Sequence, residues 1–250
     1  VVRTTLIPSL LNVYQYNKAR KVENIFLYEI SKVYDKNYEE ESKVTGLLKG
    51  DFVTSSWKQE KVKVDFYIVK GIVEDLLDSL GFHNRYSFEK SKEKDLHPGI
   101  SATILLDRKP IGILGRVHPT LIKDEVYIFE LSLNALMSPV KPIKYKEAPK
   151  YPSIEKDVAF VVKKEISASD IMAIIKKKGG RLLENVTVFD VYTGDHVKED
   201  EKSLAFKLTF MDPNRTLTDE EVMSIFHTII DGVTKELQAT LRDFYLEKHL

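Results

Sequence analysis

Apolar residues recur at helical spacing in one stretch of the first half of the chain and alternate with polar residues in several others. The clearest helix is predicted over residues 65–80, where apolar side chains return every three or four positions and Gly81 follows as a left-handed cap. A second helix is predicted over 8–16, because Pro8 suits a first helical turn. Strands are predicted over 25–34, 44–49, 101–106, 111–117 and 127–133, the third and fourth forming a hairpin.

The second half shows an ordered series of strands and helices. A strand over 157–162 precedes a helix opened by Ser167 and Asp170, and two strands over 186–192 and 203–210 precede a helix opened by Thr218 and Glu221. Both pairs have the spacing of a capping box, in which a hydroxyl and an acid satisfy the first free backbone donors of a helix. A short strand over 239–242 completes the order βαββαβ. This order is the split, ferredoxin-like pattern, and the chain as a whole is expected to be of the α+β class.

A stretch rich in proline and lysine separates the two halves. Over residues 138–152 four prolines alternate with four lysines, and proline resists helix while lysine favours solvent. We therefore predict a first domain over 1–140, a linker over 141–150 and a second domain over 151–250.

The strands of the second half are expected to present one apolar and one polar face. Alternate residues of a strand point to opposite faces, so Leu204 and Phe206 share the apolar side and Ser203 lies on the other. On the preceding strand, Asp190 and Tyr192 share one parity with Val186 and Val188. We expect Asp190, Tyr192 and Ser203 on the open face of the sheet, which is where a ligand is predicted to bind.

Composition excludes several classes of site and opposes one class of partner. The chain has no cysteine, no charged-then-apolar leader and no segment of about 20 apolar residues. We therefore expect no disulfides, no secretion and no membrane span, and we expect a cytoplasmic location. The start without Met suggests a piece of a longer chain. Residues 151–243 hold 13 Lys plus Arg against 17 Asp plus Glu. Nucleic-acid-binding domains are usually basic, so this charge of about −4 by itself opposes RNA binding.

Each conspicuous residue also has an ordinary interpretation. Asp190 and Tyr192 can be solvated strand residues. The cluster of Lys176, Lys177, Lys178 and Arg181 is either a contact for an RNA backbone or a cationic helix end that complements the helix dipole.

Other residues point to no chemistry of their own. The histidines of the His97-Pro98 and His118-Pro119 pairs are interpreted as turn residues, and Trp57 as a core residue. None of the six histidines has metal-ligand spacing, and no acid/base pair is readable, so neither a metal site nor a catalytic residue is predicted.

Several segments resemble known families. The second half resembles the ferredoxin-fold anticodon-binding domain in YPSIEKD (151–157), FDVY (189–192), KSLA (202–205), RTLT (215–218) and ATLR (239–242). The first half resembles the catalytic-like module that precedes this domain in bacterial phenylalanine–tRNA ligase β chains, in RTTLIPSLL (3–11), KGIVE (70–74), HPG (97–99) and GILGRVHP (112–119). The order and spacing of the segments are more specific than any one of them.

The resemblance implies a fold and a set of binding residues. It implies a class II synthetase-like antiparallel sheet with helices for the first domain, and an anticodon-facing surface made by the positions of Ala159, Asp190, Tyr192, Ser203 and Arg242 in the second. Strand parity agrees, since Val158 and Leu241 inside leave Ala159 and Arg242 outside. The partners it implies are tRNA(Phe) and a catalytic α chain in an α2β2 heterotetramer.

The resemblance also implies a vacant active site. Class II enzymes hold ATP with arginines of two motifs, but the strand over 25–34 has no arginine and IFELSL (128–133) stands where the second motif is expected. ATP and Mg are then used by the whole enzyme and not by this chain, which is a non-catalytic part of an aminoacyl-tRNA synthetase. Two alternatives stay open: an independent ATP-dependent ligase, and a ferredoxin-like regulatory module that senses a small ligand.

Overall fold

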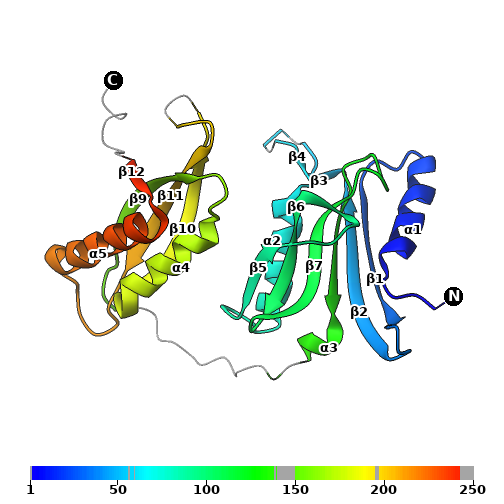
Figure 1. Cartoon of the computed structure of the whole chain (residues 1–250), viewed down its shortest axis with the longest axis horizontal. Coiled ribbons are helices and arrows are strands. Elements are labelled where there is room, and N and C mark those ends of the chain that lie inside the picture. Colours follow the sequence, from blue (N-terminus) through cyan, green and yellow to red (C-terminus); the bar gives the residue numbers. More distant parts are fainter. Residues whose placement is uncertain are drawn as a thin grey trace. The chain divides into compact units, whose positions relative to one another are not determined.

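The computed structural model of the chain describes residues 2–55, 57–58, 60–137, 139, 150–194 and 197–242. Two units are distinct, Val1–Lys144 and Tyr145–Leu250, and each is built on its own antiparallel sheet (Figure 1). The linker predicted over 141–150 lies outside the described residues except for Lys150. No described helix is long and apolar enough to cross a membrane.

The first unit contains a six-stranded sheet in the order β1-β2-β8-β7-β6-β5, in which all neighbours are antiparallel. Its strands are β1 (Ile25–Tyr34), β2 (Glu40–Lys49), β5 (Tyr86–Lys90), β6 (Leu96–Leu106), β7 (Lys109–Val117) and β8 (Tyr127–Ser132). A small separate hairpin joins β3 (Asp51–Val53) to β4 (Val62–Lys63). The strands β3, β4 and β5 are missing from the sequence prediction, because they are only three, two and five residues long and offer too short a pattern.

Helices cover both faces of this sheet. Helix α1 (Ile7–Ala19) packs Leu10 and Tyr14 against a core that includes Leu47. Helix α2 (Phe66–Ser79) packs its apolar stripe against a second core that includes the next residue of β2, Leu48. Adjacent residues of a strand point to opposite faces, so the two helices lie on opposite sides of the sheet (Figure 1). A short helix, α3 (Leu133–Leu136), follows β8.

The local signals read from the sequence account for most of these boundaries. Asp65 caps α2 by accepting a hydrogen bond from the Ile68 amide at 2.8 Å, and Gly81 follows with φ of 85°. The turn of the predicted hairpin consists of two residues, Asp107 and Arg108, because Leu106 pairs with Lys109. Both turn residues have positive φ, as a tight hairpin requires. Trp57 is not in the core as predicted: it is 89% exposed, because it follows the short strand β3 rather than a core element.

The second unit has the predicted βαββαβ order. Its elements are β9 (Ile154–Lys163), α4 (Ala168–Gly179), the 3-10 turn η1 (Gly180–Leu182), β10 (Leu183–Tyr192), β11 (Glu201–Phe210), α5 (Asp219–Leu237) and β12 (Thr240–Arg242). The four strands form an antiparallel sheet in the order β10-β11-β9-β12. Both predicted capping boxes are present, at Ser167 with Asp170 and at Thr218 with Glu221.

Both helices of the second unit share one apolar core with the sheet. Ile171 and Ile175 of α4 and Val222 and Ile229 of α5 join Phe206 and other inward-facing strand residues in this core. The helices therefore cover one face of the sheet and leave the other face without a helix (Figure 1).

Candidate nucleic-acid interface

The helix-free face of the second unit brings all five predicted site residues together in two adjacent rows across the sheet. Residues directly opposite each other in neighbouring antiparallel strands point to the same face. Read from β12 to β10, the first row is Arg242, Ala159, Ala205 and Asp190, and the second is Thr240, Val161, Ser203 and Tyr192.

A β-bulge at Phe189 places Asp190 and Tyr192 in these rows. The register of β10 on β11 shifts between Val188, which opposes core residue Phe206, and Asp190, which opposes Ala205. Strict alternation from buried Val186 would send Asp190 and Tyr192 to the helix side. The sequence prediction of one parity along β10 is thus wrong, although the face predicted for the two residues is the one they occupy. Bulges often re-aim side chains beside functional sites.

Tyr192 and Arg242 meet above the middle of the face. They come from the two edge strands of the sheet, and the Arg242 guanidinium carbon lies 4.5 Å from the centroid of the Tyr192 ring. Three of the four residues between them in the rows are small: Ala159, Ala205 and Ser203, only 1%, 2% and 2% exposed; the fourth is Val161. Small side chains leave room for the two long ones to cross, and a cation over an aromatic face is attracted by the ring quadrupole.

The predicted open face is therefore covered at its centre. Ala159 and Ser203, expected at the surface, are buried, while Asp190 is exposed and Tyr192 and Arg242 are half-buried. Leu241, expected inside, is 46% exposed because β12 is a short edge strand. Of the five predicted site residues, three therefore keep polar or aromatic groups at the surface: the Asp190 carboxylate, the Tyr192 ring and the Arg242 guanidinium.

These three groups form a set that suits an unpaired base. Within the described residues no hydrogen bond or ion pair engages the Asp190 carboxylate, which is left to accept from amino or imino groups on a base edge. Tyr192 offers an aromatic ring for stacking, the usual device for single-stranded RNA. Arg242 can stack on a base or pair with a phosphate.

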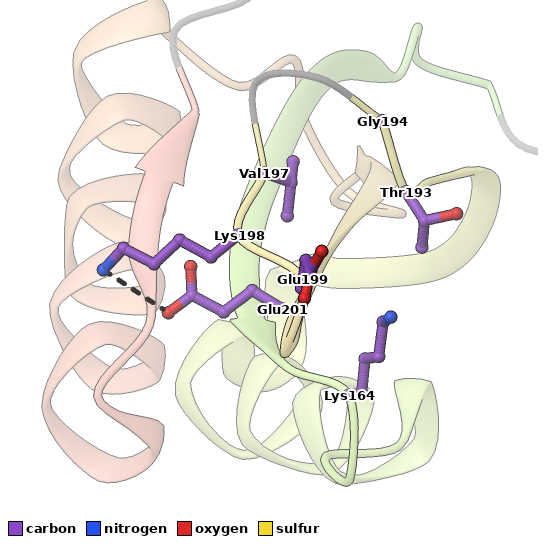
Figure 2. A pocket seen from close by; sticks show the side chains of 7 residues that line it. All are labelled: Lys164, Thr193, Gly194, Val197, Lys198, Glu199 and Glu201. Carbon is purple, nitrogen blue, oxygen red and sulfur yellow. Dashed lines mark ion pairs between the residues drawn. The ribbon is translucent and has the colours of Figure 1, made fainter.

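A pocket adjoins this face where β10 leads into β11. Figure 2 shows its lining: Lys164, Thr193, Gly194, Val197, Lys198, Glu199 and Glu201. Its lining contains two lysines, Lys164 and Lys198, and two glutamates, and Lys198 lies 4.0 Å from Glu201 (Figure 2). Beside the pocket, Lys163 contacts Asp200 at 2.6 Å and Glu201 at 3.2 Å. The hydrogen bond to Asp200 raises the pKa of Lys163. The pocket is charge-compensated and therefore has little attraction for phosphate.

The basic cluster at the end of α4 is also partly compensated. Lys178 pairs with Glu236 at 3.1 Å, and Arg181, 84% exposed, lies 3.9 Å from Asp212. Lys176 and Lys177 stand in the last turn of α4, where cations complement the helix dipole. The cluster is accounted for as a cationic helix end.

The described residues of the first unit offer no comparable site for ATP. Its buried charge in the described residues is a carboxylate, Glu130, which accepts hydrogen bonds from the Thr5 hydroxyl (2.8 Å), the Leu6 amide (2.9 Å), the Thr45 hydroxyl (3.0 Å) and Lys43 (3.0 Å). This network ties the segment before α1 to β2 and β8, so it is structural. Glu130 lies in the segment where the second ATP-holding motif is expected, and its partner Lys43 is engaged in this network, so the described residues here do not fit a nucleotide triphosphate. Among the described residues no group of three metal-binding side chains occurs.

The two conspicuous histidines of the first unit serve local turns. The ring nitrogen Nδ1 of His97 accepts from the Gly99 amide at 3.1 Å, and Nδ1 of His118 lies 2.7 Å from the Thr120 hydroxyl. Neither contact involves a catalytic partner.

Sequence reasoning missed the bulge and the residues that depend on it. Val186 and Val188 are apolar while Asp190 and Tyr192, at the same parity, are polar. That change of character at constant parity is the signal of a bulge. Ala205, one of the two inner residues of the first row, is missing from the sequence prediction because its importance lies in being small.

Comparison with known proteins agrees with the two-part reading. The family model described as phenylalanyl tRNA synthetase beta chain CLM domain matches residues 1–133, and that described as ferredoxin-fold anticodon binding domain matches residues 149–242. The phenylalanine–tRNA ligase beta subunits of Bacillus subtilis and Geobacillus kaustophilus are 41% and 40% identical over 97% of the chain, and that of Shouchella clausii is 39% identical over 96%. The chain spans 31% of the length of each of these relatives. By these matches along both of its units, the chain belongs to the phenylalanine–tRNA ligase β-subunit family.

Proposed function

We propose that this chain is a non-catalytic region of the β chain of phenylalanine–tRNA ligase. Its second unit binds the anticodon region of tRNA(Phe), and its first unit, an inactive relative of the class II synthetase catalytic domain, docks the catalytic α chain of an α2β2 enzyme. ATP and Mg²⁺ are used on that other chain during aminoacylation.

The observation that carries the tRNA proposal is the juxtaposition of Asp190, Tyr192 and Arg242 on the helix-free face. An anticodon presents unpaired bases, and proteins read such bases by stacking and by hydrogen bonds to their edges. A ring beside an acceptor and a guanidinium supplies both. The charge of about −4 over residues 151–243 then means that RNA binding depends on few phosphate contacts, so the affinity should fall only shallowly with salt.

The docking proposal rests on an apolar stripe along the edge strand β1. The stripe consists of Phe26, Tyr28 and Ile30, which alternate along the strand and are 47%, 77% and 60% exposed. Phe52 extends it, with its ring centroid 6.5 Å from that of Phe26. An exposed apolar row on an edge strand, which has a neighbouring strand on one side only, invites association, and obligate interfaces are apolar in this way.

A titration with tRNA tests the anticodon proposal and separates it from a small-ligand regulatory module. The β chain assembled with its α chain is titrated with tRNA(Phe) and, as a control, with a tRNA that differs from it in the anticodon loop alone. We expect tRNA(Phe) to bind more tightly. Equal affinities would refute anticodon reading and favour the regulatory module, whose ligand pocket would then be sought beside Gly194.

A pyrophosphate-exchange assay on this chain alone separates the proposal from the independent ligase. We expect no phenylalanine-dependent exchange above a no-protein control, because the described residues of the first unit do not fit ATP. Exchange above that control would refute the non-catalytic assignment.

A further inference from the structure

Gly194 lies against the ring of Tyr192, two residues away along the chain. A Cβ atom at position 194 would lie 2.2 Å from the Tyr192 hydroxyl oxygen, 2.4 Å from Cζ and 2.9 Å from Cε2. Real Cβ contacts are essentially never this short. The ring can occupy its present place only because residue 194 has no side chain; Figure 2 shows where Gly194 lies in this segment.

The backbone at Gly194 gives no other reason for glycine. Its φ lies outside the left-handed region, unlike that of Gly50, Gly81 and Gly180. The three heavy atoms nearest to the missing Cβ all belong to Tyr192. The steric demand for glycine thus comes from the ring and not from the loop.

The same ring is also restrained on other sides. The Arg242 guanidinium carbon lies 4.5 Å from its centroid, and Ser203, opposite Tyr192 in register, is 2% exposed. Gly194 limits the position of the hydroxyl end, while Arg242 lies over the ring face. A stacking surface held in this way needs little ordering when a ligand arrives, which favours affinity.

We propose that Gly194 is a positioning residue that sets the Tyr192 ring in place for stacking on a tRNA base. This inference rests on the proposed function. It predicts a specific effect of Gly194→Ala: the hydroxyl must retreat by about 1 Å to restore ordinary van der Waals contact. The clashing atoms are the far end of a rotatable side chain, so the ring moves and the fold holds.

The position of the ring is measured without tRNA, by ¹⁹F NMR of 3-fluorotyrosine incorporated at position 192 of this chain. We expect Gly194→Ala to shift the resonance. The matched control is Gly71→Ala, because a Cβ at position 71 meets nothing within 4 Å; it should leave the resonance unchanged. An unchanged resonance in Gly194→Ala would overturn the inference.

The consequence for binding is measured with a double-mutant cycle on the enzyme assembled from the α chain and the β chain. Gly194→Ala alone should weaken tRNA(Phe) binding about 5-fold or more, within the roughly 150-fold that loss of a base stack can cost. In a Tyr192→Ala background the same substitution should have no further effect, because the ring it displaces is gone. Equal losses in both backgrounds would overturn the inference. The Tyr192→Ala variant alone tests the proposed function, so the two failures are distinguishable.

Discussion

At the scale of single residues, the proposed interface depends on the character of a few side chains more than on charge. Asp190 is exposed and carries a negative charge toward a polyanionic ligand. Electrostatics alone would make it unfavourable for RNA. Its proposed role is specific: a carboxylate accepts hydrogen bonds at both oxygens, whereas an amide of the same shape presents donors at one end.

In Asp190→Asn, the loss of negative charge should strengthen tRNA binding, whereas the loss of a hydrogen-bond acceptor should weaken it. We expect tRNA(Phe) binding by the assembled enzyme to weaken about 5- to 150-fold, the range for losing a good base contact, even though the variant is less negative. Glu184→Gln is the matched control, since it removes the same charge from another exposed position of β10. Tighter binding by Asp190→Asn would show that only the charge matters and would contradict base reading.

At the scale of elements, capping determines where the helices of the second unit begin. In α5 the Thr218 hydroxyl accepts from the Glu221 amide at 3.3 Å, and the Glu221 carboxylate accepts from the Thr218 amide at 3.0 Å. Arg215 adds two hydrogen bonds to the same carboxylate, at 2.8 and 2.7 Å. These bonds, that of Arg215 foremost, lower the pKa of Glu221 to about 2.

The pKa of Glu221 implies a pH dependence of stability. A carboxyl group whose pKa is lower in the folded state stabilises the fold above its unfolded pKa, and this contribution is lost as the pH falls through the folded value. We expect protection of the α5 amides from hydrogen exchange to fall between about pH 4.5 and pH 2. Glu221→Gln should flatten this dependence, and Glu220→Gln, in the same first turn, should not. Identical profiles for the two variants would contradict the assignment.

Features that depend on residues of one helix or strand were predictable from the sequence. Features that depend on how two strands pair were not. The capping boxes at Ser167 and Thr218 depend on residues three apart and were found. The bulge at Phe189 depends on how β10 pairs with β11, and the burial of Ala159 depends on side chains from two edge strands. The grouping of the five site residues was predictable from the family resemblance. Strand parity agreed with it at Ala159, Ser203 and Arg242 but not along β10, where the bulge reverses it. The cover over the centre of the face was not predictable.

At the scale of the whole molecule, each unit presents one surface that its own fold leaves incomplete. In the first unit this surface is the stripe of Phe26, Tyr28 and Ile30 on β1. In the second unit it is the helix-free face of the sheet. The proposed function assigns a protein partner to the first surface and an RNA partner to the second.

Substitution in the β1 stripe should break assembly and spare the fold. Tyr28→Asp places a charge in the proposed apolar interface, and we expect the β chain to lose most of its co-purification with the α chain while its circular dichroism spectrum is retained. Tyr38→Asp is the control, because Tyr38 is equally exposed at 77% but lies in the turn before β2. Co-purification of Tyr28→Asp at the level of Tyr38→Asp would remove β1 from the interface.

The central claim, that the helix-free face stacks on an anticodon base, is tested most directly through Tyr192. The measurement is the dissociation constant of tRNA(Phe) for the assembled enzyme with Tyr192→Ala, with Tyr192→Phe as the control that keeps the ring. Stacking is worth about 1–3 kcal/mol per base, so we expect Tyr192→Ala to weaken binding roughly 5- to 150-fold and Tyr192→Phe to weaken it much less. Phenylalanine activation by ATP should be unchanged in both. A dissociation constant for Tyr192→Ala within experimental error of the unsubstituted enzyme would contradict the account.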